Sequence, residues 1–95
     1  MMIKILIVED DPGLCELMRE EISDCGYTVD LARSAQQALE SFEKSGVPDL
    51  LLLDYSLPDM NAAELVKYIS AKYGQVPPFI VSTGMGTAPL ICPLL

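Results

Sequence analysis

Acidic side chains follow two of the most apolar segments of this 95-residue sequence, at the point where each segment stops. Glu9, Asp10 and Asp11 come directly after the first segment, and Asp54 comes after four consecutive leucines. A hydroxyl residue, Thr83, follows a third apolar segment. Carboxylates that are brought close together repel one another, and a hard divalent cation such as Mg²⁺ relieves the repulsion when carboxylates, carbonyls and waters hold it. If the acids meet in space, they predict a metal site.

Whether they meet depends on the elements that carry them. Apolar runs alternate with amphipathic runs along the whole sequence, a pattern typical of parallel strands joined by crossover helices. Ser34 and Asn61 each precede a helical pattern and have Gln37 and Glu64 three residues on, which predicts two capping boxes. We therefore expect strands at 3–8, 28–33, 49–53 and 79–83, with helices at 12–25, from 35 onward, and from 62 to near Gly74.

Four strands and three helices in the order βαβαβαβ give an α/β fold with a doubly wound parallel sheet. Segment 28–33 alternates apolar and polar residues, so we place it at an edge, outside the first strand, which makes the first and third strands neighbours. All parallel strands end at one edge of the sheet, where such folds bind ligands. The acids after the first and third strands should therefore share one site.

Each acid also has a simpler structural explanation. Asp11, followed by Pro12 at the first helical position, is explained as a helix N-cap. A single acid after a strand is common because loops are polar. The argument for Asp54 comes from the coincidence of several such residues after neighbouring strands.

Three motifs resemble the receiver domain of two-component response regulators, in order and in spacing. They are "ILIVEDDP" at 5–12, "LLLLDYSLPDMNAAEL" at 50–65 and "PFIVSTG" at 78–84, and the resemblance covers residues 2 to about 84. It implies a flavodoxin-like receiver fold with strand order 2-1-3-4. It also implies a phosphoacceptor that takes its phosphoryl group from a sensor histidine kinase or a phosphotransfer protein. Such a domain is not an enzyme beyond self-catalysed phosphoryl transfer and autodephosphorylation.

The resemblance also assigns roles to individual residues. Asp54 would accept the phosphoryl group and Asp10 would bind Mg²⁺ directly, while Glu9 would complete the acidic pair through water. The remaining assignments are the backbone carbonyl of Ser56 as a further metal ligand, the Thr83 hydroxyl as the group that follows the phosphoryl group, and Gly84 as the small residue that leaves room for the phosphodonor.

The resemblance fails after Gly84. The family continues with a fourth helix, a fifth strand that ends in a lysine, and a fifth helix, whereas this sequence ends in "MGTAPLICPLL" and has no lysine after Lys72. Lys4, Lys67 and Lys72 lie too far from the acids in sequence and topology to replace that lysine. We therefore interpret residues 1–84 as the core of a C-terminally truncated receiver and residues 85–95 as an atypical apolar tail.

Two other function classes remain as alternatives. Segment 79–83 begins with three apolar residues, as an interior strand does, so an open edge there would favour self-association. The chain could then be a non-catalytic interaction or dimerisation module with impaired phosphorylation. An aspartate-nucleophile phosphatase ranks last, because "DYS" at 54–56 offers no second aspartate as an acid or base.

Composition excludes several further classes. The apolar fraction of 51% with 21% charged residues is that of a globular protein, and a net charge of -8 disfavours direct nucleic-acid binding. The apolar run at the start is too short for a signal peptide or a membrane span. The three cysteines lack the spacing of a zinc site. We expect a cytoplasmic protein with no other cofactor than Mg²⁺ and no membrane partner.

Overall fold

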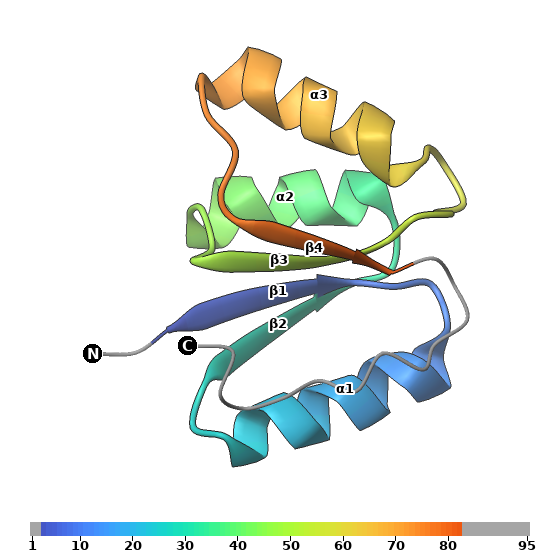
Figure 1. The fold of residues 1–95 in the computed structure, drawn as a ribbon, viewed down its shortest axis with the longest axis vertical. Coiled ribbons are helices and arrows are strands. Elements are labelled where there is room, and N and C mark those ends of the chain that lie inside the picture. The colour runs from blue at the N-terminus through green and yellow to red at the C-terminus, as the bar shows by residue number, and fades with distance from the viewer. Residues whose placement is uncertain (1–2, 83–95) are drawn as a thin grey trace.

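The chain alternates strands and helices in the computed structural model, which describes residues 3–82 (Figure 1). The elements are β1 (Lys4–Val8), α1 (Pro12–Asp24), β2 (Thr28–Ala32), α2 (Ala35–Ser45), β3 (Leu50–Asp54), α3 (Ala62–Tyr73) and β4 (Phe79–Ser82). Each predicted element is present, with ends shifted by a residue or so. The shift matters at β3, because Asp54 is the last residue of the strand, opposite Ser82 of β4.

The four strands form one parallel sheet in the order β2-β1-β3-β4, which confirms the predicted order 2-1-3-4. Ile7 of β1 pairs with Leu31 on one side and with Leu52 on the other. β1 and β3 are therefore neighbours, and all four strands end at the same edge. This edge is called the carboxyl edge below.

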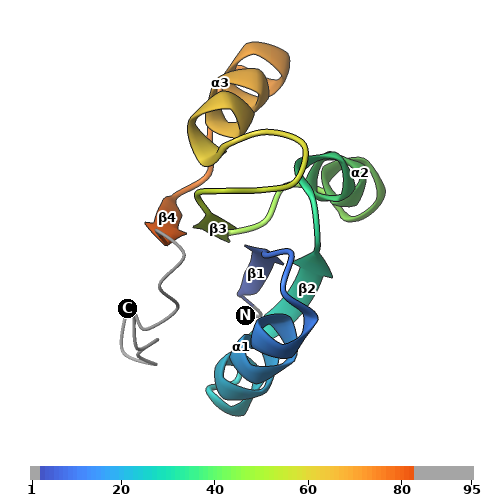
Figure 2. The same cartoon turned by 90° about the vertical axis from the view of Figure 1, so that its right-hand side faces the viewer.

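Helices cover both faces of the sheet, with α1 on one face and α2 and α3 on the other (Figure 2). Alternate residues of a strand point to opposite faces, so β1 contributes Ile5 and Ile7 to the α1 side and Leu6 and Val8 to the other. Leu65 of α3 is fully buried on that second side. The apolar runs of β1 and β3 are thus explained by burial on both faces.

Side-chain caps fix where the helices begin. Asn61 accepts a hydrogen bond from the Glu64 backbone N–H, and the Glu64 carboxylate accepts one from the Asn61 backbone N–H, so this predicted capping box is confirmed. The box predicted at Ser34 is wrong in one half. Ser34 does bind the Gln37 backbone N–H, but the Gln37 side chain accepts from the backbone N–H of Arg33, one residue earlier than a capping box requires.

The last strand of the described sheet keeps apolar side chains in solvent. Phe79, Ile80 and Val81 of β4 are 44%, 41% and 37% exposed. Within residues 3–82 there is no fourth helix or fifth strand, and no helix in this part of the chain is long and apolar enough to cross a bilayer. Thr83, Gly84 and the predicted tail at 85–95 lie outside the described residues.

Candidate metal and phosphoacceptor site

Three carboxylates meet at the carboxyl edge of the sheet. One oxygen each from Glu9, Asp10 and Asp54 lies within 4.8 Å of the others. Glu9 and Asp10 follow β1, and Asp54 ends the neighbouring β3, so the parallel pairing of the two strands brings them together. Glu9 and Asp54 are buried, with 6% and 7% of their surface exposed, whereas Asp10 is exposed. The expected meeting of the acids is therefore observed.

Backbone contacts hold Glu9 in place. Its N–H donates to the Ala32 carbonyl at 2.9 Å, which extends the pairing of β1 with β2 by one residue. Its carbonyl accepts from the Cys15 thiol at 3.0 Å, and its carboxylate Oε2 accepts from the Asp11 N–H at 3.2 Å. The Glu9 carboxylate therefore lies close both to the Asp11 N–H, just before α1, and to the Asp54 carboxylate.

Asp54 is buried with an incomplete set of partners. No hydrogen bond reaches its Oδ1 from any residue in the described part of the chain. A buried carboxylate oxygen without a donor is costly, and a bound cation is one way to satisfy it. The set of hard oxygen atoms on Glu9, Asp10 and Asp54 suits Mg²⁺, which is commonly held by one or two carboxylates together with waters. These residues fit a magnesium ion.

The electrostatics of the cluster agree with that fit. Burial raises the pKa of Glu9 to about 7, against the lowering effect of the hydrogen bond from the Asp11 N–H. The charges of Asp54 and Asp10 and a hydrogen bond to Asp10 also contribute to this rise. Without a cation, Glu9 therefore titrates near neutral pH, and a divalent cation would favour its ionised form.

Asp11 lies outside the cluster, as its explanation as an N-cap predicts. Its Oδ1 accepts from the N–H groups of Gly13 and Leu14 at 2.9 Å and 3.3 Å. Ser56 lies two residues after Asp54 in the loop from β3 to α3, where it bridges to Asn61. Its role as a carbonyl ligand stays a prediction. Thr83 and Gly84, predicted to act at this edge, lie outside the described residues.

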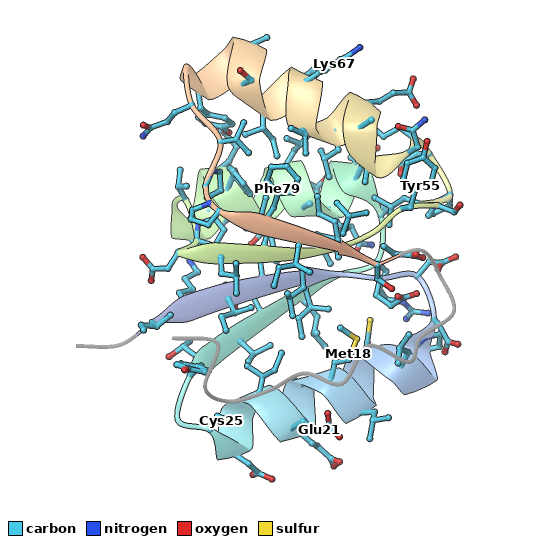
Figure 3. All side chains as sticks on the ribbon, in the orientation of Figure 1. Met18, Glu21, Cys25, Tyr55, Lys67 and Phe79 are labelled. Carbon is cyan, nitrogen blue, oxygen red and sulfur yellow. The ribbon has the colours of Figure 1, made fainter. Side chains whose placement is uncertain are left out.

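Lys4, Lys67 and Lys72 all lie away from the carboxylate cluster. Lys4 binds the Ser45 carbonyl at 2.6 Å and lies 3.6 Å from Asp30, at the opposite edge of the sheet. Lys72 pairs with Glu43 at 3.4 Å near the end of α3. Lys67 projects from α3 away from the sheet (Figure 3). None of the three reaches the carboxylate cluster.

Sequence reasoning missed Asp59, which lies in the same loop as Ser56. Both oxygens of its carboxylate accept hydrogen bonds from the first backbone N–H groups of α2. An aspartate after Pro58 is a common turn residue, and no nearby residue signals a partner 24 residues earlier in the sequence.

Comparison with known proteins gives a consistent result. The model of the response regulator receiver domain family matches residues 5–92. The transcriptional regulatory protein TrcR of Mycobacterium tuberculosis is 36% identical over 67 residues, which are 70% of this chain and 26% of TrcR. The chain thus spans about a quarter of that curated relative.

Solved receiver structures resemble the chain in fold as well as in sequence. The non-phosphorylated HemR receiver domain of Leptospira biflexa matches with a TM-score of 0.70 and 34% identity, over 85% of this chain and 65% of that one. The response regulator TrrA of Thermotoga maritima, solved in complex with Mg²⁺ and BeF, matches with a TM-score of 0.70 and 34% identity. The match covers 84% of this chain and 66% of TrrA.

Proposed function

The chain belongs to the response regulator receiver domain family, and from this premise we propose that it accepts a phosphoryl group on Asp54 with the help of Mg²⁺. Receiver domains of response regulators interact with histidine kinases or phosphotransfer proteins in two-component signal transduction. We propose such a protein as the phosphodonor here, and the cytoplasm as the location.

One observation carries the proposal. Asp54 is a buried carboxylate at the end of a central strand, and its Oδ1 has no hydrogen-bond partner among residues 3–82. Oxygen atoms of Glu9 and Asp10 lie within 4.8 Å. A strand whose residues are buried on both faces keeps the side chain at its end in one place. This arrangement supports a fixed nucleophile next to a cation site.

The proposed step is a transfer between two carriers. A carboxylate oxygen of Asp54 forms a bond to phosphorus while the bond from phosphorus to the donor's histidine nitrogen breaks, and the imidazole leaves with that electron pair. Such transfers depend mainly on positioning and on the neutralisation of charge on the phosphoryl oxygens. Asp54 supplies the nucleophile, and Glu9, Asp10, Asp54 and the Ser56 carbonyl would hold Mg²⁺. The ion would neutralise negative charge at this edge when bound.

Incubation with acetyl phosphate and Mg²⁺, followed by intact mass measurement, tests the proposal. We expect one phosphoryl adduct per chain. No adduct should form when EDTA is added before acetyl phosphate. The Asp54→Asn variant should show no adduct, because an amide is not a nucleophile of this kind. Asp49→Asn is the matched control, since Asp49 lies directly before β3, at the other end of that strand from Asp54, and accepts a hydrogen bond from the Lys4 backbone N–H. An adduct that persists in Asp54→Asn would show that the site is misassigned.

The exposed residues of β4 favour a second candidate function. A strand with Phe79, Ile80 and Val81 in solvent can pair with another polypeptide, which would make the chain an interaction or dimerisation module. Sedimentation velocity with and without beryllofluoride and Mg²⁺ separates the two functions. The phosphoacceptor proposal requires an effect of beryllofluoride on the protein. Self-association that is the same with and without beryllofluoride and Mg²⁺ would favour the interaction module.

A further inference from the structure

The apex of the loop between β3 and α3 is attached to a helix from another part of the sequence. Asp59 Oδ1 accepts a hydrogen bond from the Ala35 N–H, and Asp59 Oδ2 accepts one from the Gln36 N–H, both at 2.9 Å. These N–H groups begin α2 and have no acceptor within the helix. A negative charge at this position also interacts favourably with the helix dipole.

The pKa of Asp59 reflects this contact. Asp59 is exposed, and the partial desolvation of its carboxylate acts to raise the pKa, but hydrogen bonds from the backbone N–H groups of Ala35, Gln36, Asp59 and Met60 outweigh this and hold the pKa below its ordinary value. The ionised form is therefore the one that the structure favours. Its attachment is a charge-assisted one, stronger than a bond between neutral groups.

α2 has other means of support at the same end. The Ser34 hydroxyl accepts from the Gln37 N–H at 3.1 Å, and Ala35, Ala38 and Phe42 are buried against the sheet. The helix would therefore still form without the Asp59 contact. What Asp59 adds is an attachment point for its own loop.

The loop is otherwise held near its ends and by one apolar side chain. The Tyr55 carbonyl accepts from the Ala62 N–H at 2.8 Å, Ser56 bridges to Asn61, and Leu57 is buried in the core beneath. Tyr55 marks the beginning of this loop at the carboxyl edge (Figure 3). With Asp59 bound to α2, the loop is fixed on both sides of Ser56.

We propose that Asp59 is a positioning residue of the metal site, which acts by anchoring residues 55–61 to α2 so that the Ser56 carbonyl keeps one direction beside Asp54. The inference rests on the proposed function, because it concerns the affinity of that site for Mg²⁺. Groups that orient metal ligands typically change the affinity 10- to 100-fold when they are removed. We expect Asp59→Ala to weaken Mg²⁺ binding by about tenfold or more.

The matched control is Ser34→Ala, which removes a hydrogen bond from the same end of α2 and leaves the loop intact. Both variants should melt at a lower temperature than the parent chain, since each loses a cap. In calorimetric titrations with MgCl₂, only Asp59→Ala should bind more weakly. Asp59→Asn keeps one acceptor oxygen of two, so it should fall between the parent and Asp59→Ala, and it serves as the test variant if Asp59→Ala does not fold.

Amide hydrogen exchange in EDTA gives a second measurement that needs no metal. The Ala62 N–H, which closes the loop, should exchange faster in Asp59→Ala than in Ser34→Ala. Equal Mg²⁺ affinities for the Asp59 variants and the parent would overturn the inference, as would equal weakening in Ser34→Ala. If the parent chain itself binds no Mg²⁺, the proposed function fails, and the exchange rates still decide whether Asp59 anchors the loop.

Discussion

The Lys4 ammonium donates a hydrogen bond to the Ser45 carbonyl at 2.6 Å, which joins the first residue of β1 to the last residue of α2. A cation at a helix C-terminus satisfies a carbonyl that has no partner within the helix and interacts favourably with the dipole. The contact lies at the edge of the sheet opposite the carboxylates. Lys4 therefore has a structural explanation that is independent of any phosphoryl group.

We expect Lys4→Met to lower the free energy of unfolding by about 0.5–1.5 kcal/mol, because one hydrogen bond to a helix end is lost. Mg²⁺ affinity and the yield of the acetyl phosphate adduct should stay unchanged. Urea denaturation and intact mass measure the two quantities. A variant that folds normally and loses its phosphoryl adduct would contradict this separation of roles.

Adjacent aspartates should differ in their effect on metal binding. Asp10 belongs to the carboxylate cluster, while Asp11 binds the backbone of α1. Asp10→Asn should weaken Mg²⁺ binding by at least about tenfold, the lower end of what loss of a supporting group costs. Asp11→Asn should bind Mg²⁺ as the parent does, since asparagine is an equally good N-cap. Calorimetric titration of both variants tests this, and equal losses would place Asp11 in the site.

Glu9 should make the stability of the metal-free protein depend on pH. Burial raises the pKa of Glu9 to about 7 in the folded chain, against an ordinary value of 4.5. Between these values the folded state holds a proton that the unfolded state has lost, so stability falls as pH rises through the window. The decrease in the free energy of unfolding across this window approaches about 3 kcal/mol, because a pKa shift of one unit corresponds to about 1.36 kcal/mol.

Urea denaturation in EDTA between pH 4.5 and 8 measures this dependence. Glu9→Gln should flatten the slope in this window, because the amide does not titrate. Excess Mg²⁺ should also reduce the slope for the parent chain, since a bound cation favours the ionised carboxylate. A parent profile that rises steadily to pH 8 in EDTA would show that Glu9 is not protonated there.

The same substitution should have opposite effects at two glycines. Gly74 ends α3 with φ +79, where a Cβ would meet no atom but the backbone conformation disfavours any L side chain. Gly74→Ala should therefore cost about 1 kcal/mol. Gly13 is the second residue of α1, and a Cβ there would be 3.4 Å from Asp11 Oδ1, at the short limit of an ordinary contact. Gly13→Ala should stabilise by about 0.4–1 kcal/mol. Thermal melting of both variants, compared with the parent, gives the two signs.

Short-range sequence patterns explain which features of the fold could be predicted. Strand and helix positions follow from apolar periodicity over a few residues, and the Asn61 cap follows from side chains three residues apart. The strand order follows from the edge-like alternation of segment 28–33. Once the order is known, Asp10 and Asp54 must lie at one edge, because parallel strands end together.

The sequence by itself therefore determined the elements, the sheet order and the edge that carries the acids. Only the tertiary structure decided that Glu9 is buried with a raised pKa and that Asp59 is attached to α2. It also decided that the Gln37 side chain accepts from the Arg33 N–H and not from the Ser34 N–H. Burial and charge depend on every segment packed around a side chain, and Asp59 meets Gln36 across 23 residues of sequence. Contacts between residues so far apart in the sequence form only when the chain folds, so a local sequence pattern does not reveal them.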